Sequence, residues 1–434
     1  MTTAELDAAV AQVESDLAQH YADGGRLGVV KAPPGSGKTH TLIRTLTRLA
    51  TDLRIAVAAQ TNTQADDIWR RLAETDPSVP LTRFASQGHP PPPDFPSGAA
   101  WTTATRDLHG AEGVVVSTSA KWALVDVDRP FDVLAVDEAW QMAWVDLMQC
   151  ATVSERFLLI GDPGQIPPVV TIDVRRWETS PRSPHAAAPD VVLGDEALMK
   201  DGYAGSLPAC RRLPFEAVPY IMPFYDFNFA PYVGPGERGV DLPASHRLQE
   251  LADGRPLAVT LPTPPAGPPL EVDQELAAAA AELVVDLLAS DATVRSVGEP
   301  RELVATDLGI TSSHRMMNAA IESVLGGRAR GVRVDTPERW QGVERPVMLA
   351  VHPMSGVTAP TAFDLDTGRL CVMASRHQAA HILITRDHVP ETLANLVPSA
   401  EQAPGKPDAV GRGHDAHMRY WAMLEKEGRV APLN

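Results

Sequence analysis

One nine-residue segment, Lys31-Ala-Pro-Pro-Gly-Ser-Gly-Lys-Thr39, constrains the fold more than any other part of the chain. It follows a short apolar run, Leu27–Val30, and precedes a stretch in which apolar residues recur at helical spacing. Strand, glycine-rich turn and helix in this order fit the phosphate-binding pattern G-x-x-x-x-G-K-[ST], except that Ala32 replaces the first glycine. The sequence therefore predicts a strand–helix unit whose connecting turn surrounds a phosphate group.

The residue types in this turn suit a nucleotide with a bound magnesium ion. Gly35 and Gly37 allow the backbone N–H groups to face phosphate oxygens, and the helix N-terminus adds a positive partial charge. Lys38 can reach the outer phosphates, and the Thr39 hydroxyl can ligate Mg²⁺. We therefore expect ATP and Mg²⁺ as ligands. The expected nucleotide-binding residues of the turn are Ala32, Pro33, Pro34, Gly35, Ser36, Gly37, Lys38 and Thr39.

Two acidic residues directly follow an apolar strand predicted at 131–136. A strand that ends beside the phosphate-binding turn would place Asp137 where it can ligate Mg²⁺ together with Thr39. The next residue, Glu138, would then be able to orient and deprotonate the attacking water. We predict that Asp137 is a metal ligand and that Glu138 is the catalytic base.

A third candidate lies after the apolar run 156–160, in the turn Gly161-Asp-Pro-Gly-Gln-Ile-Pro-Pro168. The side-chain amide of Gln165 can both donate and accept hydrogen bonds, so it can sense a phosphate oxygen or the attacking water. We expect Gln165 to act with Lys38 and Glu138 at the γ-phosphate.

Apolar runs alternate with helical stretches along most of the chain, which indicates an α/β fold with parallel sheets. Proline-rich punctuation between 207 and 235 separates two such sets. The first set of predicted strands is 26–31, 54–59, 113–117, 131–136 and 156–160, and the second is 256–260, 303–311, 347–351 and 381–385. We expect one domain over 1–213, a second over 214–397, and a linker with a short C-terminal helix over 398–434.

Composition narrows the classes of function and the compartment. The 434 residues carry a net charge of −17, which counts against strong non-specific nucleic-acid binding by the whole surface but does not exclude a local basic groove. The three cysteines lie far apart, so no disulfide framework or zinc site is expected. No signal peptide or membrane-spanning segment is indicated, and we expect a cytoplasmic protein without a membrane partner.

Three of the segments described above resemble the motifs of a known family and occur in the same order as in that family. Ala32–Thr39, Asp137–Ala139 and Gly161–Pro168 closely resemble the first-domain motifs of superfamily 1 DNA/RNA helicases, above all the branch that moves 5′→3′. The resemblance covers roughly residues 25–390. It implies two RecA-like P-loop NTPase domains and a motor that hydrolyses ATP.

The resemblance also implies contacts to nucleic acid. Residues 55–62 resemble the family's motif Ia, and Thr61 and Asn62 are its candidates for binding the nucleic-acid backbone. Residues 334–344 resemble motif V, T-x-x-x-x-Q-G-x-E. By this resemblance Thr336 and Gln341 contact nucleic acid, and Glu344 contacts the nucleotide.

Two arginine-bearing segments complete the resemblance. Residues 369–376 resemble motif VI, which implies that Arg376 is an arginine finger. Residues 207–214 resemble the segment that carries a phosphate-contacting arginine, either Arg211 or Arg212, with Arg211 slightly preferred. The family's adenine-reading glutamine upstream of the phosphate turn could be Gln12 or Gln19.

The expected function is an ATP-dependent motor that couples Mg²⁺-ATP hydrolysis to movement on single-stranded DNA or RNA, with DNA weakly favoured. The alternative is a nucleic-acid-stimulated ATPase subunit of a larger complex without unwinding activity of its own. The gaps between motifs leave no room for accessory domains, so a protein partner that supplies an accessory function is a further expectation. A P-loop protein unrelated to nucleic acid is disfavoured by the matches to motifs V and VI.

Overall fold

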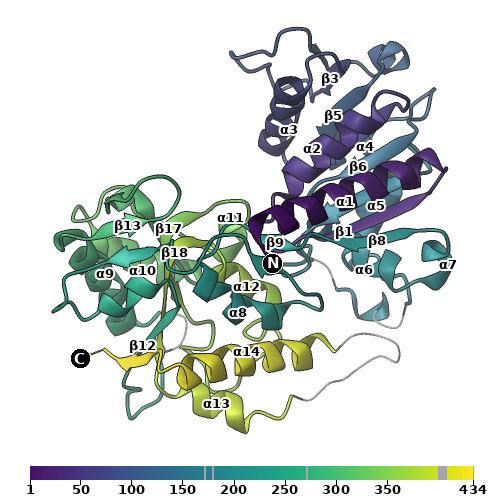
Figure 1. The fold of residues 1–434 in the computed structure, drawn as a ribbon. Helices are drawn as coiled ribbons and strands as arrows, with labels where there is room; N and C mark the ends of the chain where they lie inside the picture. The colour runs from purple at the N-terminus through teal and green to yellow at the C-terminus, as the bar shows by residue number, and fades with distance from the viewer. Residues whose placement is uncertain (171–172, 178–179, 270–271, 399–407, 434) are drawn as a thin grey trace. The chain divides into compact units, whose positions relative to one another are not determined.

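The computed structural model describes all residues except 171–172, 178–179, 270–271, 399–407 and 434, and these residues form two compact units (Figure 1). The first unit contains the described residues of Met1–Pro163 and Pro167–Pro208. The second contains Gly164–Ile166 and the described residues from Ala209 onward. The change of unit after Pro208 lies close to the boundary expected at 213, whereas the three residues around Gln165 were expected in the first domain.

The first unit is built on an eight-stranded, wholly parallel sheet in the order β4-β3-β5-β2-β6-β7-β1-β8. Its five predicted strands are present, and three short strands were missed. The strands are β1 (Leu27–Lys31), β2 (Ile55–Ala59), β3 (Leu81–Phe84), β4 (Ala100–Thr102), β5 (Val114–Thr118), β6 (Val133–Val136), β7 (Phe157–Gly161) and β8 (Tyr203–Ser206).

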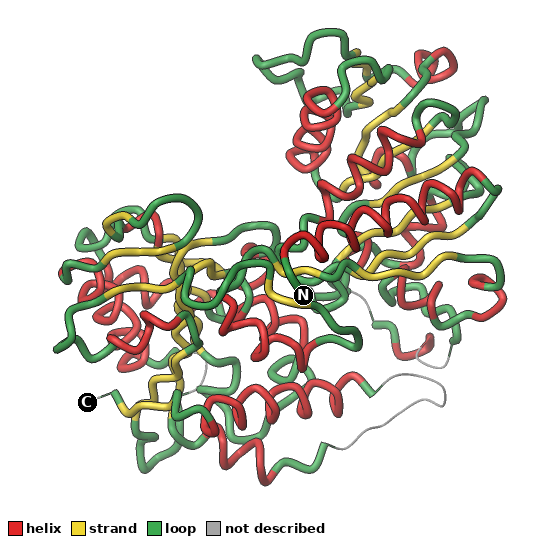
Figure 2. The backbone as a smooth tube through the Cα atoms, in the orientation of Figure 1, coloured by secondary structure: helices red, strands yellow, loops and turns green. Residues whose placement is uncertain are grey.

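Alternate residues of the central strands point to opposite faces of the sheet and are buried in two separate cores. Because both faces are buried, the sequences of these strands are continuous apolar runs. On β2, Val57 and Ala59 pack with α1–α3, whereas Ala56 and Ala58 face the core that includes α4–α6. Helices thus cover both faces of the sheet (Figure 2). They are α1 (Thr3–Ala22), α2 (Lys38–Leu49), α3 (Asn62–Thr75), α4 (Ser119–Trp122), α5 (Trp144–Gln149), α6 (Ala188–Leu193) and α7 (Glu196–Met199).

The second unit contains a six-stranded parallel sheet in the order β16-β15-β17-β18-β12-β19. The same unit also contains a three-stranded antiparallel sheet, β11-β13-β14, and a parallel pair, β10-β9. The strands are β9 (Ala209–Cys210), β10 (Ala230–Pro231), β11 (Gly239–Asp241), β12 (Leu257–Leu261), β13 (Thr293–Arg295), β14 (Arg301–Glu302), β15 (Leu308–Thr311), β16 (Arg333–Asp335), β17 (Arg345–Val351), β18 (His377–Arg386) and β19 (Val430–Pro432).

The second sheet is also covered on both faces. Val347 and Leu349 of β17 pack in the core formed with α9 and α10, and Ala350 of the same strand packs in the core formed with α8, α12 and α14. The helices are α8 (Val218–Ile221), α9 (Gln274–Ala289), α10 (Arg315–Leu325), α11 (Pro337–Trp340), α12 (Thr367–Ala374), α13 (Val389–Asn395) and α14 (Ala409–Lys426). The predicted fold class, α/β with two large parallel sheets as in a pair of RecA-like domains, is confirmed. Among the described residues, no helix has the length and apolar character needed to cross a bilayer.

The C-terminal segment forms part of the second unit. The segment 398–434, expected to hold a linker and a short helix, falls partly on residues outside those described, and its helix α14 begins at Ala409. Tyr420, Trp421 and Leu424 of that helix are buried in the core. After the helix, β19 pairs with β12 and becomes the sixth strand of the sheet, which the sequence did not predict.

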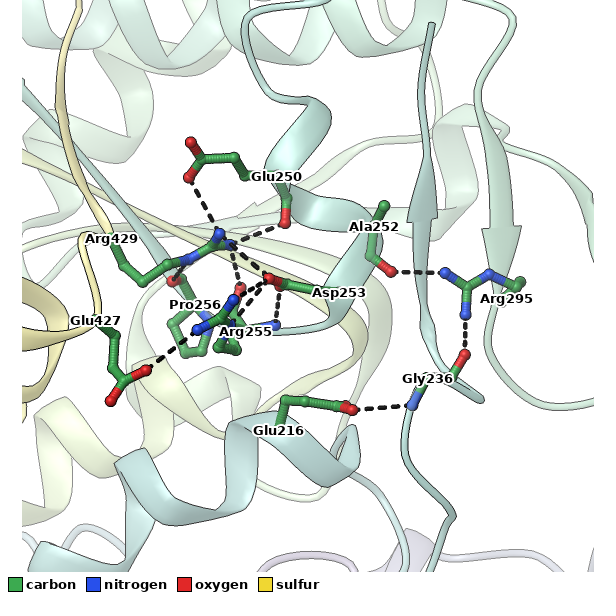
Figure 3. Close-up of polar contacts among 10 residues, drawn as sticks. All are labelled: Glu216, Gly236, Glu250, Ala252, Asp253, Arg255, Pro256, Arg295, Glu427 and Arg429. Carbon is green, nitrogen blue, oxygen red and sulfur yellow. Dashed lines mark hydrogen bonds and ion pairs between the residues drawn. The ribbon is translucent and has the colours of Figure 1, made fainter. Parts of the chain in front are cut away.

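Arg429 lies in the turn between α14 and β19, and Figure 3 shows its polar contacts. Its buried guanidinium donates to the carbonyl oxygens of Glu250, Pro256 and Arg255 at 2.9–3.2 Å, and it lies within 3.3 Å of a carboxylate oxygen of Asp253. Backbone carbonyls from a distant loop are thereby satisfied by a single cation.

We predict that Arg429→Met loosens this edge of the sheet. Loss of a buried cation with several hydrogen bonds should lower the free energy of opening of β12 by about 2–4 kcal/mol. Hydrogen–deuterium exchange of Leu257–Leu261 measures this opening. Arg419→Met is the matched control, because Arg419 is an exposed arginine of α14 that pairs with the exposed Asp415. Equal exchange in both variants would contradict the role of Arg429.

Candidate nucleotide-binding site

The turn between β1 and α2 has the backbone geometry of an anion cradle. Gly35 and Gly37 adopt φ values of +62° and +84°, a region that disfavours any residue with a side chain. Gly37 is the N-cap of α2 and supplies no side-chain acceptor, so the N–H groups of the first helical turn remain available to a ligand. Ala32 does not adopt a positive φ, so its replacement of the first glycine introduces no backbone strain.

The Ser36 hydroxyl is the clearest sign that the cradle suits a ligand. Its oxygen is buried and has no hydrogen-bond partner among the described residues, while the Ser36 backbone N–H donates to the Pro33 carbonyl at 3.2 Å. A buried hydroxyl without a partner costs free energy, and a phosphate oxygen in the cradle would satisfy it. The turn therefore fits a phosphate group.

Two polar pairs connect this turn to the end of β6. Lys38 Nζ lies 2.8 Å from Glu138 Oε1, and both side chains are mostly buried. The Thr39 hydroxyl donates to Asp137 Oδ2 at 3.0 Å. The structure thus brings together the four residues that the sequence predicted for metal binding and catalysis in this unit.

Electrostatics distinguish Asp137 from an ordinary surface acid. Burial and the adjacent Glu138 raise the pKa of Asp137 to about 6, against the opposing effects of Lys38 and the Thr39 hydroxyl. A divalent cation at this position would favour the ionised carboxylate. No group of three or more histidine, cysteine or acidic side chains that could hold a metal occurs in the described part of the chain. The Thr39 hydroxyl and the Asp137 carboxylate supply two oxygen donors. This set fits Mg²⁺, which is held by one or two protein oxygens together with nucleotide phosphate and water.

Glu138 has an unusual backbone. Its φ of +53° and ψ of +43° place it in the left-handed region, where it is the sole non-glycine residue with positive φ among those described. A non-glycine residue in this conformation costs about 1–2 kcal/mol, so packing must enforce it. The strained turn directs the Glu138 side chain to Lys38, while Asp137 remains paired with Thr39.

Gln165 is fixed from the second unit. The segment Gly164–Ile166 belongs to that unit, and Gln165 is buried. Gly368 at the start of α12 packs against it so closely that a Cβ there would lie 2.4 Å from the Gln165 carbonyl oxygen. Gln341 donates to the Ile166 carbonyl at 3.3 Å. The predicted sensor and the predicted motif V glutamine are therefore neighbours within one unit.

Glu344 is the centre of a polar cluster in the second unit. Its carboxylate accepts hydrogen bonds from Arg212 Nε and, at 2.6 Å, from Gln378 Nε2. Burial would raise the pKa of Glu344, but the contact with Arg212, the Gln378 hydrogen bond and the charge of Arg376 together lower it. The carboxylate is therefore stabilised as an anion between two arginines.

The two candidate arginines at 211 and 212 have different surroundings. Arg212 also donates to the Ser375 carbonyl at 3.2 Å, next to Arg376, whereas the Arg211 guanidinium lies 3.6 Å from the ring centroid of Tyr232. Of the two, Arg212 is the one that shares a cluster with Glu344 and Arg376. Because Arg211 and Arg212 are adjacent in a loop, the sequence alone does not indicate which of them joins this cluster.

The remaining predicted residues have local roles. Thr61 is the N-cap of α3, where its hydroxyl accepts from the Gln64 N–H, and Asn62 bonds to Arg83. Thr336 is the buried N-cap of α11. The two glutamines considered for adenine recognition are exposed on α1, where they bond to Asp16 and Asp23, and neither contact points to a nucleotide.

Comparison with known proteins agrees with the geometry of the first unit. A family model described as an AAA domain matches residues 10–176, fewer than half of the 434. This span includes the phosphate turn, Asp137, Glu138 and Gln165. The first unit contains a P-loop NTPase domain. No curated protein matches the chain.

Solved helicase structures are similar to the chain at low identity. An arterivirus nonstructural protein 10 helicase is 17% identical, with 84% of this chain and 61% of that one covered and a TM-score of 0.44. The PRRSV helicase is 15% identical, with 83% and 52% covered and a TM-score of 0.42. A complex of the arterivirus helicase with DNA is 15% identical, with 83% of this chain and 61% of that one covered and a TM-score of 0.42. The chain spans about three fifths or less of the length of these helicases.

The paired geometry of Lys38 with Glu138 predicts two distinguishable defects. Lys38→Ala should abolish ATP binding or turnover, because the cation that reaches the outer phosphates is lost. Glu138→Gln keeps an oxygen for Lys38 but removes the proton acceptor, so ATP should still bind while kcat falls about 10²–10⁴-fold.

Nucleotide binding by fluorescence and steady-state turnover measure the two effects. Glu155→Gln is the control, since Glu155 is a highly exposed acid of the same unit. Wild-type turnover by the Glu138→Gln variant would show that another group is the base.

Proposed function

We propose that the protein is an ATP-dependent nucleic-acid motor of the superfamily 1 type, which couples Mg²⁺-ATP hydrolysis to movement on single-stranded DNA or RNA. The observation that carries the proposal is the assembly of Lys38, Thr39, Asp137 and Glu138 at one end of a parallel sheet. A second parallel-sheet unit in the same chain carries the residues of motifs V and VI, in the order expected of such a motor.

The proposal divides the chemistry between the units. In the first, Thr39 and Asp137 hold Mg²⁺, Lys38 binds the outer phosphates, and Glu138 activates water. From the second, Arg376 stabilises the charge that develops on the transferred phosphoryl group. Arg376 is buried in the turn between α12 and β18, next to the cluster around Glu344. Arg211 remains the sequence-based candidate for a further phosphate contact, and the cluster makes Arg212 the alternative.

Coupling to nucleic acid is proposed through residues of both units. Thr61 and Asn62 lie at the N-terminus of α3, and Thr336 and Gln341 flank α11. The hydrogen bond from Gln341 to the Ile166 carbonyl supports a coupling role, because it joins a predicted strand-contacting residue to the segment that holds Gln165. A change at the γ-phosphate could thereby alter the position of Gln341.

A second candidate function is a nucleic-acid-stimulated ATPase subunit that does not unwind duplex by itself. The connection between β3 and β4 favours it, because residues 85–99 form a short loop where an accessory domain would have to be inserted. The net charge of −17 also favours help from a protein partner in reaching a polyanion. Unwinding of a tailed duplex by the purified chain, with and without such a partner, separates the two functions.

We expect single-stranded nucleic acid to stimulate ATP hydrolysis. Steady-state turnover at saturating ATP and low salt should rise on addition of oligo-dT or an RNA of equal length. Half-maximal stimulation should need more polynucleotide as salt increases, because binding to a polyanion releases counterions. Turnover that neither DNA nor RNA changes would contradict a nucleic-acid motor.

We expect Arg376→Ala to lower kcat rather than ATP affinity. An arginine finger acts mainly in the transition state, and its loss typically costs on the order of 10³-fold or more. Arg376 is buried, so the variant's folding must be verified by its melting profile. Arg376→Lys, which retains the charge, tests whether the guanidinium geometry is needed. An unchanged kcat in a folded Arg376→Ala variant would reduce Arg376 to a structural role.

A further inference from the structure

Arg83 is a fully buried cation at the end of β3 in the first unit. Its Nε donates to Asp66 Oδ1 at 2.8 Å, and its Nη1 donates to the carbonyl oxygen of Phe84 at 2.8 Å. Its Nη2 donates to the side-chain oxygen of Asn62 at 2.9 Å. One guanidinium therefore joins β3 to the first two turns of α3.

The contact with Asn62 determines which way its amide faces. A guanidinium has only hydrogen-bond donors, so the amide group that meets it must be the oxygen. The amide nitrogen, with its two donors, must then point away from Arg83. No acceptor for Asn62 Nδ2 is present among the described residues, and Asn62 is partly exposed. The contact thus leaves two oriented donors available to an external acceptor.

The support for Arg83 is itself rigid. Burial lowers the pKa of Arg83, and the Asp66 carboxylate opposes this effect, so the cation has a fixed counter-charge. The second oxygen of Asp66 lies 2.7 Å from His89 Nε2, and the His89 ring stacks on Trp101. A donor group held in this way loses little conformational entropy when it binds.

We infer that Arg83 is a positioning residue that fixes the Asn62 amide with its N–H groups outward, so that Asn62 donates to a phosphate oxygen of the bound nucleic-acid strand. The inference rests on the proposed function and adds to it a residue and a direction of hydrogen bonding. The N-terminus of α3 contributes in the same direction, because its helix dipole favours an anion beside Asn62.

The test is a double-mutant cycle on affinity for fluorescently labelled oligo-dT, measured by anisotropy without nucleotide. Asn62→Ala removes a hydrogen bond to a charged group and should weaken binding on the order of 10-fold. Arg83→Gln should weaken binding similarly in the wild-type background but hardly at all in the Asn62→Ala background. Any effect of the uncovered Asp66 charge is present in both backgrounds and cancels in the cycle.

A salt titration supplies a second readout. Because a neutral amide releases no counterion, Asn62→Ala should lower affinity without changing the slope of log affinity against log salt. Asn62→Asp keeps an acceptor for Arg83, so it should fold normally. It removes both donors and places a negative charge where the phosphate would lie, so it should bind more weakly than Asn62→Ala. This variant tests the inference even if Arg83→Gln does not fold.

Arg54→Gln is the matched control. Arg54 is a buried arginine that directly precedes β2, at the amino ends of the strands, whereas Arg83 lies near the carboxyl end of β3. It donates to the Ala111 carbonyl at 2.7 Å. Its substitution should lower stability but leave the affinity for oligo-dT unchanged.

The outcomes are distinguishable. A wild-type chain that does not bind oligo-dT or RNA would overturn the proposed function together with this inference. A wild-type chain that binds, with equal losses for Arg83→Gln in both backgrounds, would overturn the inference alone. The same holds if Asn62→Asp binds like wild type, or if Arg54→Gln weakens binding as much as Arg83→Gln.

Discussion

The nucleotide site depends on the close approach of the ends of strands β6, β7 and β1. The last residue of the middle strand, β7, must be glycine for this approach. In the first sheet β7 lies between β6 and β1, so a residue after β6 must cross the end of β7 to meet the phosphate turn. A Cβ on Gly161 would lie 2.8 Å from the Ala139 backbone nitrogen and 3.0 Å from the Trp140 ring. Without that atom, the turn at Glu138 can pass over β7 and the contacts to Lys38 and Thr39 can form. Gly161 therefore determines the geometry of the site without contacting a ligand.

Two adjacent carboxylates can take different roles because the backbone turns between them. Asp137 ends a regular strand and is held by the Thr39 hydroxyl, so it lies where a cation bound to that hydroxyl would be. Glu138 is in the left-handed conformation and meets Lys38 instead. If both acids faced the same point, mutual repulsion would keep one of them protonated. Burial first, and then the nearby Glu138 charge, raise the pKa of Asp137, and this pKa would fall when a divalent cation binds.

The site in the first unit could be predicted from sequence because it is built from short-range patterns. Each element is a strand followed by a turn with a fixed order of residues, and parallel strands bring their carboxyl ends to one edge. The strands of this unit that were missed, β3, β4 and β8, have three or four residues of mixed polarity, too short for a periodic signal. Strand β19 was missed because it forms only by pairing with β12, more than 160 residues earlier in the chain.

The contacts in the second unit could be predicted less well for a related reason. The clustering of Arg212 with Glu344 joins residues 132 positions apart and depends on the packing of several loops. The motif match over residues 207–214 predicted the segment, but not which of its two arginines contacts Glu344. The attachment of Gly164–Ile166 to the second unit likewise follows from the contact of Gln165 with Gly368, where the missing Cβ, not a recognisable motif, permits the approach.

Buried arginines recur wherever a distant loop must be held in place. In the first sheet, Arg54 holds a loop at the amino ends of the strands and Arg83 joins the carboxyl end of β3 to α3. Arg386 and Arg429 hold segments of the second unit. Arg386 binds both oxygens of Asp273 at 2.7 and 2.8 Å, a geometry that lysine cannot reproduce. A planar group with five donors can satisfy several carbonyls and one carboxylate at once, so it orders a loop that has no apolar core. Because a guanidinium has only donors, it also sets the direction of the hydrogen bond: the group that faces it must be an acceptor. For Asn62 this leaves its donors for a ligand, and a structural contact becomes a constraint on what the surface can bind.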